Sequence, residues 1–397
     1  MRKIGLFLDT QPANGGVFQY NLSILDAVAA LPPDRYQAVI AYTAPHWQEH
    51  LSRYPVRAIF VNYHFTARVT GILLNLMRIP LPLWHRLAPL LQRHARQLIG
   101  ERCDLWLFPS QDSVSYQLPL PSLTTILDLA HRYVKRFPES ASSYEYLLRE
   151  RGFANLCRWA KGVLVDSETG RRQVMESYGL PRERVHPLPY VAPFYMHAAS
   201  LQPDFAVRYH LPEKFLFYPA QFWEHKNHRN LLKAFASLKK DLPDLKLVLA
   251  GAKKNAYDAV IALVRELNLT DDVQFLGYVP NEDMSELYRL ARALVMPTYF
   301  GPTNIPPLEA SVVGCPVAIS GVSAMQDQLG DSVLVFDPDS VEEIAGCIRR
   351  LWTDDRLCAD MSAAGRERMA AWGQAAFNTR LTEIIDQLFE DRPELRP

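Results

Sequence analysis

One lysine lies where a positive charge could act on a ligand. Lys226 lies in the polar turn of YPAQFWEHKNHRNLLKAF, between a short apolar run and an amphipathic stretch. An ammonium group just ahead of a helix can neutralise a diphosphate, because its charge adds to the positive field of the helix N-terminus. The alternative is an ordinary solvated surface lysine, and the turn by itself does not decide between the two interpretations.

A carboxylate follows a second polar loop, in VMPTYFGPTNIPPLEASVVGCPV. An apolar run ends at Pro297, and the proline pair beginning at Pro306 predicts a helix start, where proline is tolerated. Glu309 is then predicted to lie in the first turn, where the helix dipole stabilises a carboxylate that can bind hydroxyl groups. Capping alone would not explain why so polar a loop ends in two prolines. The backbone N–H groups expected to face an anion are those of Thr303, Asn304 and Ile305.

A glycine pair follows the first apolar run of the chain. Gly15 and Gly16 lie in DTQPANGGVFQYN, ahead of a helix expected from about Val17 to Leu31. Glycine lets backbone N–H groups approach a phosphate, and the helix presents its positive end there. A tight turn without a ligand explains the segment equally well. Because the segment matches neither G-x-G-x-x-G nor a Walker loop, it does not support a dinucleotide or nucleoside-triphosphate site.

Alternating strands and helices are expected to position these residues. Short runs rich in Val, Ile, Leu and Phe recur between amphipathic stretches, which is typical of parallel strands buried on both faces. The predicted strands are Lys3–Leu8, Ala38–Tyr42, Ala58–Val61, Leu105–Phe108, Thr124–Leu127, Val163–Val165, Phe215–Tyr218, Leu245–Ala250, Val273–Leu276, Ala293–Met296, Val317–Ile319 and Val333–Phe336.

The alternation is interrupted once. Prolines cluster and periodicity is lost between residues 186 and 213, which predicts a linker between two doubly wound α/β lobes. In open parallel sheets ligands bind at the carboxyl ends of the strands, so a cleft between two such lobes is the expected site. The last stretch, Gln374–Phe389, is predicted to form an amphipathic helix outside both sheet patterns.

Length, charge and cysteine content exclude several classes of protein. The chain has 397 residues, 48% of them hydrophobic, so we expect two domains and exclude a disordered protein. Its 43 basic and 43 acidic residues cancel, which argues against nucleic acid as the main partner. Five cysteines without a C-x-x-C pair favour a reducing cytosol. We expect the N-terminus to form a buried strand rather than a signal peptide, and no apolar run reaches the roughly 18 residues of a membrane span.

One basic segment has two interpretations. Residues 64–99 mix long apolar side chains with five arginines. Such a segment can lie on an anionic membrane, where a lipid-linked molecule could dock. It can equally form a pair of helices that face the core and expose a solvated basic face. The arginines are Arg68, Arg78, Arg86, Arg93 and Arg96.

The segment TYFGPTNIPPLEASVVGCPV resembles the signature of the family 4 glycosyltransferases, the bacterial group 1 glycosyltransferases. The resemblance implies the GT-B fold, with two Rossmann-like lobes facing a cleft, and transfer with retention at the anomeric carbon. The family motif has two glutamates separated by seven residues; Glu309 matches the second, which binds the ribose, and Gly301 stands at the first. Because the first glutamate contacts the transferred sugar in the family, Gly301 is a departure that affects the donor-sugar contacts.

Three further segments match the family in the same order along the chain. The resemblance implies that the glycine loop at Gly15 and Gly16 approaches the donor phosphate and the acceptor. It implies that Lys226, in FWEHKNH, binds the diphosphate, with Gln221 where relatives often have an arginine. It also implies that FLGYVPNEDMSELY lines the nucleobase. The residues of that segment expected nearest the base are Gly277 and Val279.

A histidine follows the predicted strand Thr124–Leu127. Many relatives place a histidine at the end of this strand, where Leu127 stands here, and Asp128 and His131 follow. His131 is a candidate catalytic residue that could bind the sugar or polarise the acceptor. It could equally serve only to anchor the loop.

An acidic pair imitates a metal motif. Asp337-Pro338-Asp339 has the D-x-D pattern, but it follows a predicted strand and precedes a helix expected at Ser340. Asp and Ser are common turn and capping residues, so we predict capping and no metal. A helix N-terminus together with Lys226 can supply the positive field instead.

Taken with these features, the resemblance implies a retaining, metal-independent hexosyltransferase. We expect an acceptor lobe over residues 1–198, a donor lobe over 199–373, and a C-terminal helix over 374–397 that packs back on the first lobe. The donor would be a UDP- or GDP-sugar, with GDP-mannose favoured. The resemblance also implies that the acceptor is a glycan or lipid-linked glycan of a bacterial surface polysaccharide, in the cytoplasm at the inner face of the membrane. The alternatives are a nucleotide-sugar 2-epimerase and a non-catalytic sugar-nucleotide-binding subunit.

Overall fold

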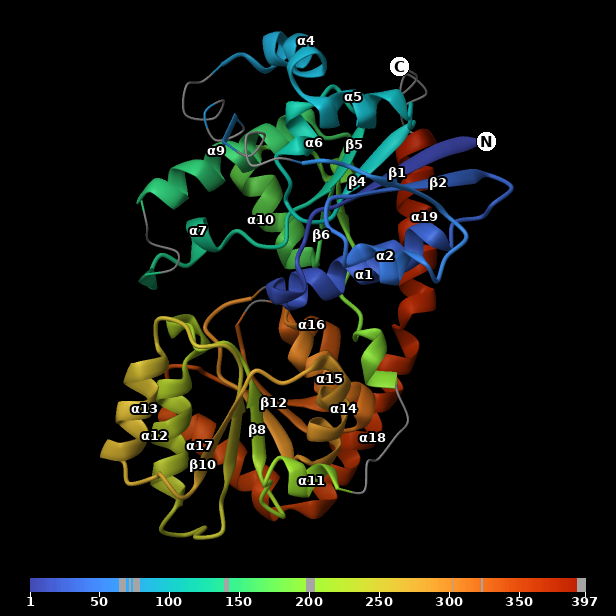
Figure 1. The fold of residues 1–397 in the computed structure, drawn as a ribbon. Helices are drawn as coiled ribbons and strands as arrows, with labels where there is room; N and C mark the ends of the chain where they lie inside the picture. The colour runs from blue at the N-terminus through green and yellow to red at the C-terminus, as the bar shows by residue number, and fades with distance from the viewer. Residues whose placement is uncertain are drawn as a thin grey trace. The chain divides into compact units, whose positions relative to one another are not determined.

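The computed structural model describes residues 1–63, 69–70, 73, 79–138, 143–197, 204–301, 303–322 and 324–390. They form two compact units (Figure 1). Unit 1 comprises Met1–Lys135, Ser140–Tyr190 and Gln374–Pro397, and unit 2 comprises Arg136–Glu139 and Val191–Gly373. The chain therefore passes between the two units more than once.

A seven-stranded parallel sheet forms the centre of unit 1, in the order β3-β2-β1-β4-β5-β6-β7. Its inner strands β4 and β6 and most of β1 are continuous apolar runs, which can be buried on both faces because helices cover them. The strands are β1 (Arg2–Leu8), β2 (Tyr36–Tyr42), β3 (Arg57–Phe60), β4 (Leu105–Phe108), β5 (Ser122–Thr125), β6 (Gly162–Val165) and β7 (Val185–Pro187).

The helices of unit 1 end where local sequence signals place their ends. In α10, Ser167 Oγ accepts a hydrogen bond from Gly170 N, and Gly179 ends the helix in the left-handed conformation. The described helices are α1 (Gly16–Ala29), α2 (Trp47–Leu51), α4 (Leu81–Leu91), α5 (Arg93–Gly100), α6 (Val114–Gln117), α7 (Ala130–Tyr133), α9 (Ser143–Trp159), α10 (Glu168–Tyr178) and α19 (Gln374–Glu390).

Helix α19 lies along α1 within unit 1, as the red and blue helices in Figure 1 show. Its apolar face is buried, including Phe377 and Leu381. Two polar contacts fix its register on α1: Gln374 Nε2 donates to Ser23 O at 2.9 Å, and Asn378 Nδ2 donates to Asp26 Oδ2 at 3.0 Å.

A six-stranded parallel sheet forms the centre of unit 2, in the order β10-β9-β8-β11-β12-β13. Its strands are β8 (Leu216–Pro219), β9 (Leu247–Ala250), β10 (Val273–Gly277), β11 (Ala293–Met296), β12 (Val317–Ser320) and β13 (Val333–Phe336). Its described α-helices are α11 (Phe205–Arg208), α12 (His228–Leu238), α13 (Tyr257–Glu266), α14 (Asn281–Leu290), α15 (Ile305–Val313), α16 (Met325–Leu329), α17 (Val341–Thr353) and α18 (Asp355–Ala371).

The predicted doubly wound α/β class is confirmed, with two local corrections. Strand β7 overlaps the start of the stretch predicted to be a linker, because its three residues pair with β6 although the strand ends in a proline at the sheet edge. Strand β5 spans Ser122–Thr125 rather than Thr124–Leu127, because Leu123, Thr124 and Thr125 are the residues in register with β6.

The basic segment is described only in part. Residues 64–68, 71–72 and 74–78, with Arg68 and Arg78, lie outside the described residues, whereas α4 and α5 lie within them. Helix α4 buries Leu81, Trp84 and Ala88 against its own unit. Among the described residues, no helix combines the length and the apolar character needed to cross a bilayer.

Candidate functional site

The residues of unit 2 that are predicted to bind the nucleotide sugar lie around the point where the strand order of the sheet reverses. The chain runs outward from β8 to β9 and β10, then returns to pair β11 with the other side of β8. Ligands of open α/β sheets bind at this switch point, outside the carboxyl ends of the strands. The segment with Lys226 follows β8, and the segment with Asn304 and Glu309 follows β11, so the two flank that point.

Lys226 lies half-buried in a single 3-10 turn, Glu224–Lys226, directly ahead of α12. Its Nζ donates to Asn304 Oδ1 at 3.2 Å, and within the described part of the chain no carboxylate pairs with it. Burial lowers the pKa of the Lys226 ammonium to about 8. Among the described residues this cation therefore has no counter-charge, in a place where an anionic ligand would supply one.

The backbone of this turn is held by hydrogen bonds from neighbouring loops. Tyr218 Oη donates to Lys226 O at 2.9 Å, and Tyr299 N donates to His225 O at 2.8 Å. The imidazole ring of His228, two residues after Lys226, is buried and stacks on the Phe222 ring with the ring centroids 4.5 Å apart. Burial lowers the pKa of His228 to about 3, so this neighbour of Lys226 stays neutral.

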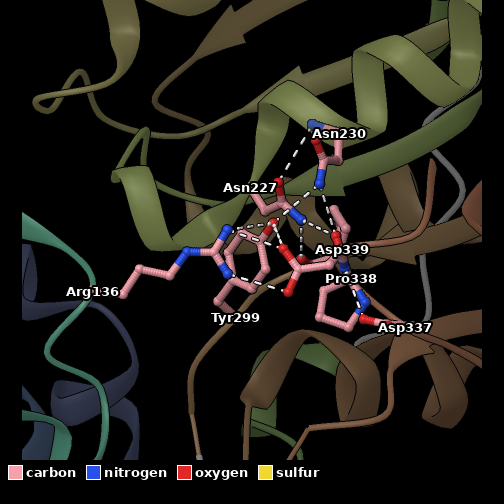
Figure 2. A network of polar contacts seen from close by, with 8 residues as sticks. Arg136, Asn227, Asn230, Tyr299, Asp337, Pro338 and Asp339 are labelled. Carbon is pink, nitrogen blue, oxygen red and sulfur yellow. Dashed lines mark hydrogen bonds and ion pairs between the residues drawn. The ribbon is translucent and has the colours of Figure 1, made fainter.

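Asn227 fastens the same turn to two other loops. It has φ +57°, a left-handed conformation that asparagine tolerates, and it caps α12. Its Nδ2 donates to Pro297 O at 3.0 Å and to Pro338 O at 2.9 Å. Asn230 adds a bond from its Nδ2 to the same Pro338 oxygen, as Figure 2 shows. The loops after β8, β11 and β13 are thus held to one another, and Lys226 has a rigid base.

Arg136 closes this network (Figure 2). Its guanidinium donates to both carboxylate oxygens of Asp339, at 3.2 and 3.0 Å, and lies over the Tyr299 ring. Tyr299 Oη also donates to Asp339 Oδ1 at 2.9 Å. The hydrogen bonds from Arg136 and Tyr299 lower the pKa of the Asp339 carboxyl.

The acidic pair 337–339 has structural partners. Ser340 Oγ accepts from Glu343 N and caps α17, and Asp337 Oδ1 accepts from Asp339 N at 2.9 Å. The predicted turn and capping chemistry is therefore present. Among the described residues, no cluster of three or more His, Cys, Asp or Glu side chains has the arrangement of a metal site.

Glu309 is buried in α15, with an exposed fraction of 4%. Both carboxylate oxygens accept tyrosine hydroxyls: Oε1 accepts from Tyr195, and Oε2 accepts from Tyr288 at 2.7 Å. Burial raises the pKa of Glu309, and the two hydroxyl donors partly oppose that effect. Each oxygen keeps a second lone pair, so the carboxylate can still accept a ligand hydroxyl.

The predicted first-turn position of Glu309 is wrong. Helix α15 begins at Ile305, so Glu309 is its fifth residue and lies in the second turn. Burial among aromatic residues, rather than the helix dipole, is the main influence on its carboxylate. The two tyrosines were missed in the sequence because they lie 114 and 21 residues away and carry no local signal.

The other predicted donor residues occupy neighbouring carboxyl-end loops. Thr303 is buried, Asn304 is the N-cap of α15 and Ile305 is its first residue. Gly277 ends β10, and Val279 is buried just beyond it. The Gln221 side chain bonds to a neighbour in its own turn, where its Oε1 accepts from Trp223 Nε1 at 2.9 Å. Of the predicted pairs, the structure brings Lys226 and Asn304 into direct contact.

The predicted residues of unit 1 fall into two kinds of environment. Gly15 has φ +58° and opens α1, and both Gly15 and Gly16 are exposed with open space around the Gly15 α-carbon. His131 is instead buried, with Nε2 3.3 Å from Glu150 Oε2 and its ring against Phe153. Burial and the nearby Arg149 charge lower the pKa of His131.

Comparison with known proteins gives the same assignment as the motifs. Residues 205–368 match the family model described as "Glycosyl transferases group 1", which confirms the resemblance found in the sequence. The O-antigen chain mannosyltransferase B of Escherichia coli is 27% identical over 226 residues, which are 55% of this chain and 59% of the relative. The O-antigen chain mannosyltransferase RfbU of Salmonella typhimurium is 26% identical over 192 residues, 48% of this chain and 51% of the relative. The matches thus span between about half and three fifths of these relatives' own length.

Solved structures share the fold of the whole chain. HepE of Anabaena, in complex with UDP and glucose, superposes with a TM-score of 0.72 at 17% identity, covering 97% of this chain and 100% of that one. WaaG, a glycosyltransferase involved in lipopolysaccharide biosynthesis, gives a TM-score of 0.67 at 18% identity over 96% of this chain and 99% of that one. The expected GT-B fold, with its two Rossmann-like units, is confirmed.

Proposed function

Because residues 205–368 match the family model of the group 1 glycosyltransferases, we propose that this chain is a hexosyltransferase that uses a nucleotide-diphosphate sugar. The observation that carries the proposal is Lys226. It is a half-buried ammonium without a carboxylate partner among the described residues, at the switch point of the unit 2 sheet. A diphosphate supplies the missing negative charge.

Each part of the donor has a proposed contact within unit 2. Lys226 binds the diphosphate, together with the backbone N–H groups of the loop that ends at Ile305. Glu309 accepts the ribose hydroxyls on its free lone pairs, and the loop at Gly277 and Val279 lines the nucleobase. As the bond between the anomeric carbon and the phosphate oxygen breaks, negative charge grows on the leaving diphosphate. The Lys226 ammonium is already in place to stabilise that charge.

The chemistry that we propose is transfer with retention. The acceptor hydroxyl oxygen forms the new bond to the anomeric carbon on the face from which the diphosphate leaves, and its proton passes to a phosphate oxygen. This route needs no covalent intermediate on the protein. For His131 we propose a positioning role, because its ring is buried against α9 and its Nε2 meets Glu150.

We propose GDP-mannose as the donor and a growing surface polysaccharide as the acceptor, in the cytoplasm. The relatives named O-antigen chain mannosyltransferases support this choice. The UDP in the HepE structure makes a UDP-sugar the second donor to test.

Nucleotide release from a panel of sugar donors tests the function. We expect GDP release from GDP-mannose only when a lipid-linked or oligosaccharide acceptor extract is present, and little release from UDP-, dTDP- or ADP-sugars. Interconversion of the free sugar nucleotide without acceptor would instead identify an epimerase. Nucleotide binding without turnover, across all acceptor extracts, would indicate a non-catalytic subunit.

For the basic segment we propose contact with an anionic membrane. Helix α4 buries one apolar face and exposes a second, with exposed fractions of 71% for Leu90 and 67% for Leu91. Arg86, Arg93 and Arg96 are exposed beside these leucines, and residues 50–100 contain no Asp or Glu. Apolar side chains beside unopposed arginines suit the interface of anionic lipids.

Vesicle flotation tests this contact. We expect the full chain to bind vesicles that contain phosphatidylglycerol and not to bind vesicles of phosphatidylcholine alone. The double variant Leu87→Glu/Leu90→Glu should lose binding at least tenfold, since two charges replace apolar contacts. Val207→Glu, which alters an equally exposed apolar residue of unit 2, is the matched control and should bind normally. Equal binding by all three proteins would contradict the assignment.

A further inference from the structure

The side chain of Asn304 stands at a helix N-cap without capping the helix. Its backbone has φ −139° and ψ 144°, the extended conformation of an N-cap, yet no cap hydrogen bond is formed from its side chain. An N-cap asparagine normally accepts a bond from the N–H of the second or third helical residue. Here those residues are Pro306 and Pro307, which have no N–H. The double proline thus leaves the amide free for another partner.

That partner is Lys226. Asn304 Oδ1 accepts from Lys226 Nζ at 3.2 Å, and on the opposite side Nδ2 lies 3.2 Å from Met325 Sδ and 3.5 Å from Gly301 O. Only one orientation of the amide satisfies these neighbours, because the ammonium can only donate and the carbonyl can only accept. The amide is thereby held between the loop, α16 and the lysine.

Gly301 provides the space that the amide occupies. A β-carbon added to Gly301 would lie 2.3 Å from Asn304 Nδ2 and 2.8 Å from Asn304 Cγ, well inside contact distance. Gly301 also has φ +127°, which side chains rarely adopt. A side chain at position 301 and the observed position of the Asn304 amide are therefore mutually exclusive.

From these contacts we propose that Asn304 is a positioning residue, whose side-chain oxygen fixes the Lys226 ammonium for the donor diphosphate. Glycine is required at position 301 because it leaves room for the Asn304 amide. The proposal rests on the proposed function only in naming the diphosphate. A neutral amide suits this task, since it orients the ammonium without cancelling its charge. A carboxylate in the same place would pair with Lys226 and repel the phosphates.

The first experiment measures the pKa of Lys226 in the nucleotide-free full-length chain, from the pH dependence of amine labelling at that residue. The titratable groups nearest the Lys226 turn include Glu224, His225, His228 and Tyr218, which all variants keep. Asn304→Ala removes an acceptor from the charged form, so the pKa should fall below that of the wild type by about half to one pH unit. Asn304→Asp adds a negative charge, so the pKa should rise by about one to three pH units.

Gly301 is tested in the same assay. Gly301→Ala should lower the pKa of Lys226 as Asn304→Ala does, because the new methyl group displaces the amide. The double variant should match Asn304→Ala alone, since the contact can be lost only once. Asn281→Ala, an asparagine at the start of α14, is the control and should leave the pKa of Lys226 unchanged. An unchanged pKa in both Asn304 variants would overturn the proposal, whether or not Gly301→Ala folds.

Nucleotide binding separates this inference from the proposed function. Calorimetric titration of GDP and UDP between pH 7 and 10 should show that Asn304→Ala weakens binding, with the loss beginning at lower pH than in the wild type. Asn304→Asp should bind several-fold more weakly at pH 7 and show little further loss up to pH 9. If the pKa of Lys226 shifts as expected but neither nucleotide binds any variant or the wild type, the positioning role stands and the proposed function fails.

Discussion

Lys226→Ala is expected to lower the affinity for the donor nucleotide by roughly 30- to 1000-fold, because truncating one member of a partly buried charge pair costs about 2–4 kcal/mol. The structure gives the physical reason. The ammonium is half-buried, lacks a carboxylate partner among the described residues, and rests on a turn held by Tyr218 and Asn227. The remaining N–H groups of the site carry only partial charges, so they cannot replace a full one. Calorimetric titration of GDP and UDP at pH 7 measures the loss.

The same residue predicts how binding depends on pH. In the free protein the pKa of Lys226 is about 8, and a bound diphosphate would raise it. Affinity should therefore be level below pH 8 and fall by up to tenfold per pH unit above it, as a proton must be taken up on binding. Lys226→Arg keeps its charge over this range, so its affinity should stay level above pH 8 even if it is weaker at pH 7.

Two observations would contradict this assignment. Lys240→Ala, an exposed lysine after the last turn of α12, serves as the control and should bind nucleotide normally. If Lys240→Ala lost as much nucleotide affinity as Lys226→Ala, the loss would reflect the overall positive charge of the protein and not a contact made by Lys226. Wild-type affinity in Lys226→Ala would remove Lys226 from the site altogether.

Glu309→Ala is expected to lower kcat/KM by roughly 100- to 1000-fold. Two effects add: the ribose hydroxyls lose their acceptor, and the buried hydroxyls of Tyr195 and Tyr288 lose theirs. Glu309→Gln keeps one acceptor oxygen and should lose less. A half-buried carboxyl of the same unit, Asp272, precedes β10 and pairs with Lys239 and Lys246; Asp272→Asn is the control and should change kcat/KM less than threefold.

The choice of nucleotide separates ribose binding from a general loss of structure. The wild type should bind GDP more tightly than 2′,3′-dideoxy-GDP, and Glu309→Ala should bind the two equally. Burial raises the pKa of Glu309, so its carboxylate takes up a proton at a higher pH than an ordinary glutamate does. As the solution is acidified, wild-type activity should therefore begin to fall at that higher pH. Glu309→Gln should lack that fall. A wild-type protein indifferent to the ribose hydroxyls would exclude Glu309 from their recognition.

Local sequence determined the architecture of this chain. Parallel strands buried on both faces are typically continuous apolar runs, so β1, β4, β6 and β11 were visible without any structure. Caps at Ser167 and Ser340 were visible for a similar reason, because a cap bonds to backbone within three residues. The same reasoning failed at β7, whose three residues form a strand only because β6 lies beside them.

The candidate site was predicted as residue types and not as contacts. Lys226 and Glu309 could be named because each follows a strand at a polar loop, and a carboxyl-end loop is where an α/β sheet binds ligands. The residues that contact them could not be predicted. The turn that holds Lys226 depends on Pro297 and Pro338, and the carboxylate of Glu309 depends on Tyr195 and Tyr288.

The pairing of Asn304 with Lys226 shows what only the tertiary structure decided. The sequence contains the double proline that frees the amide and the glycine that makes room for it, all within seven residues. It does not contain the partner, which lies 78 residues earlier. Lys226 and Asn304 meet because β8 and β11 are neighbours in the sheet, and strand order is set by the burial of the whole unit rather than by any local pattern.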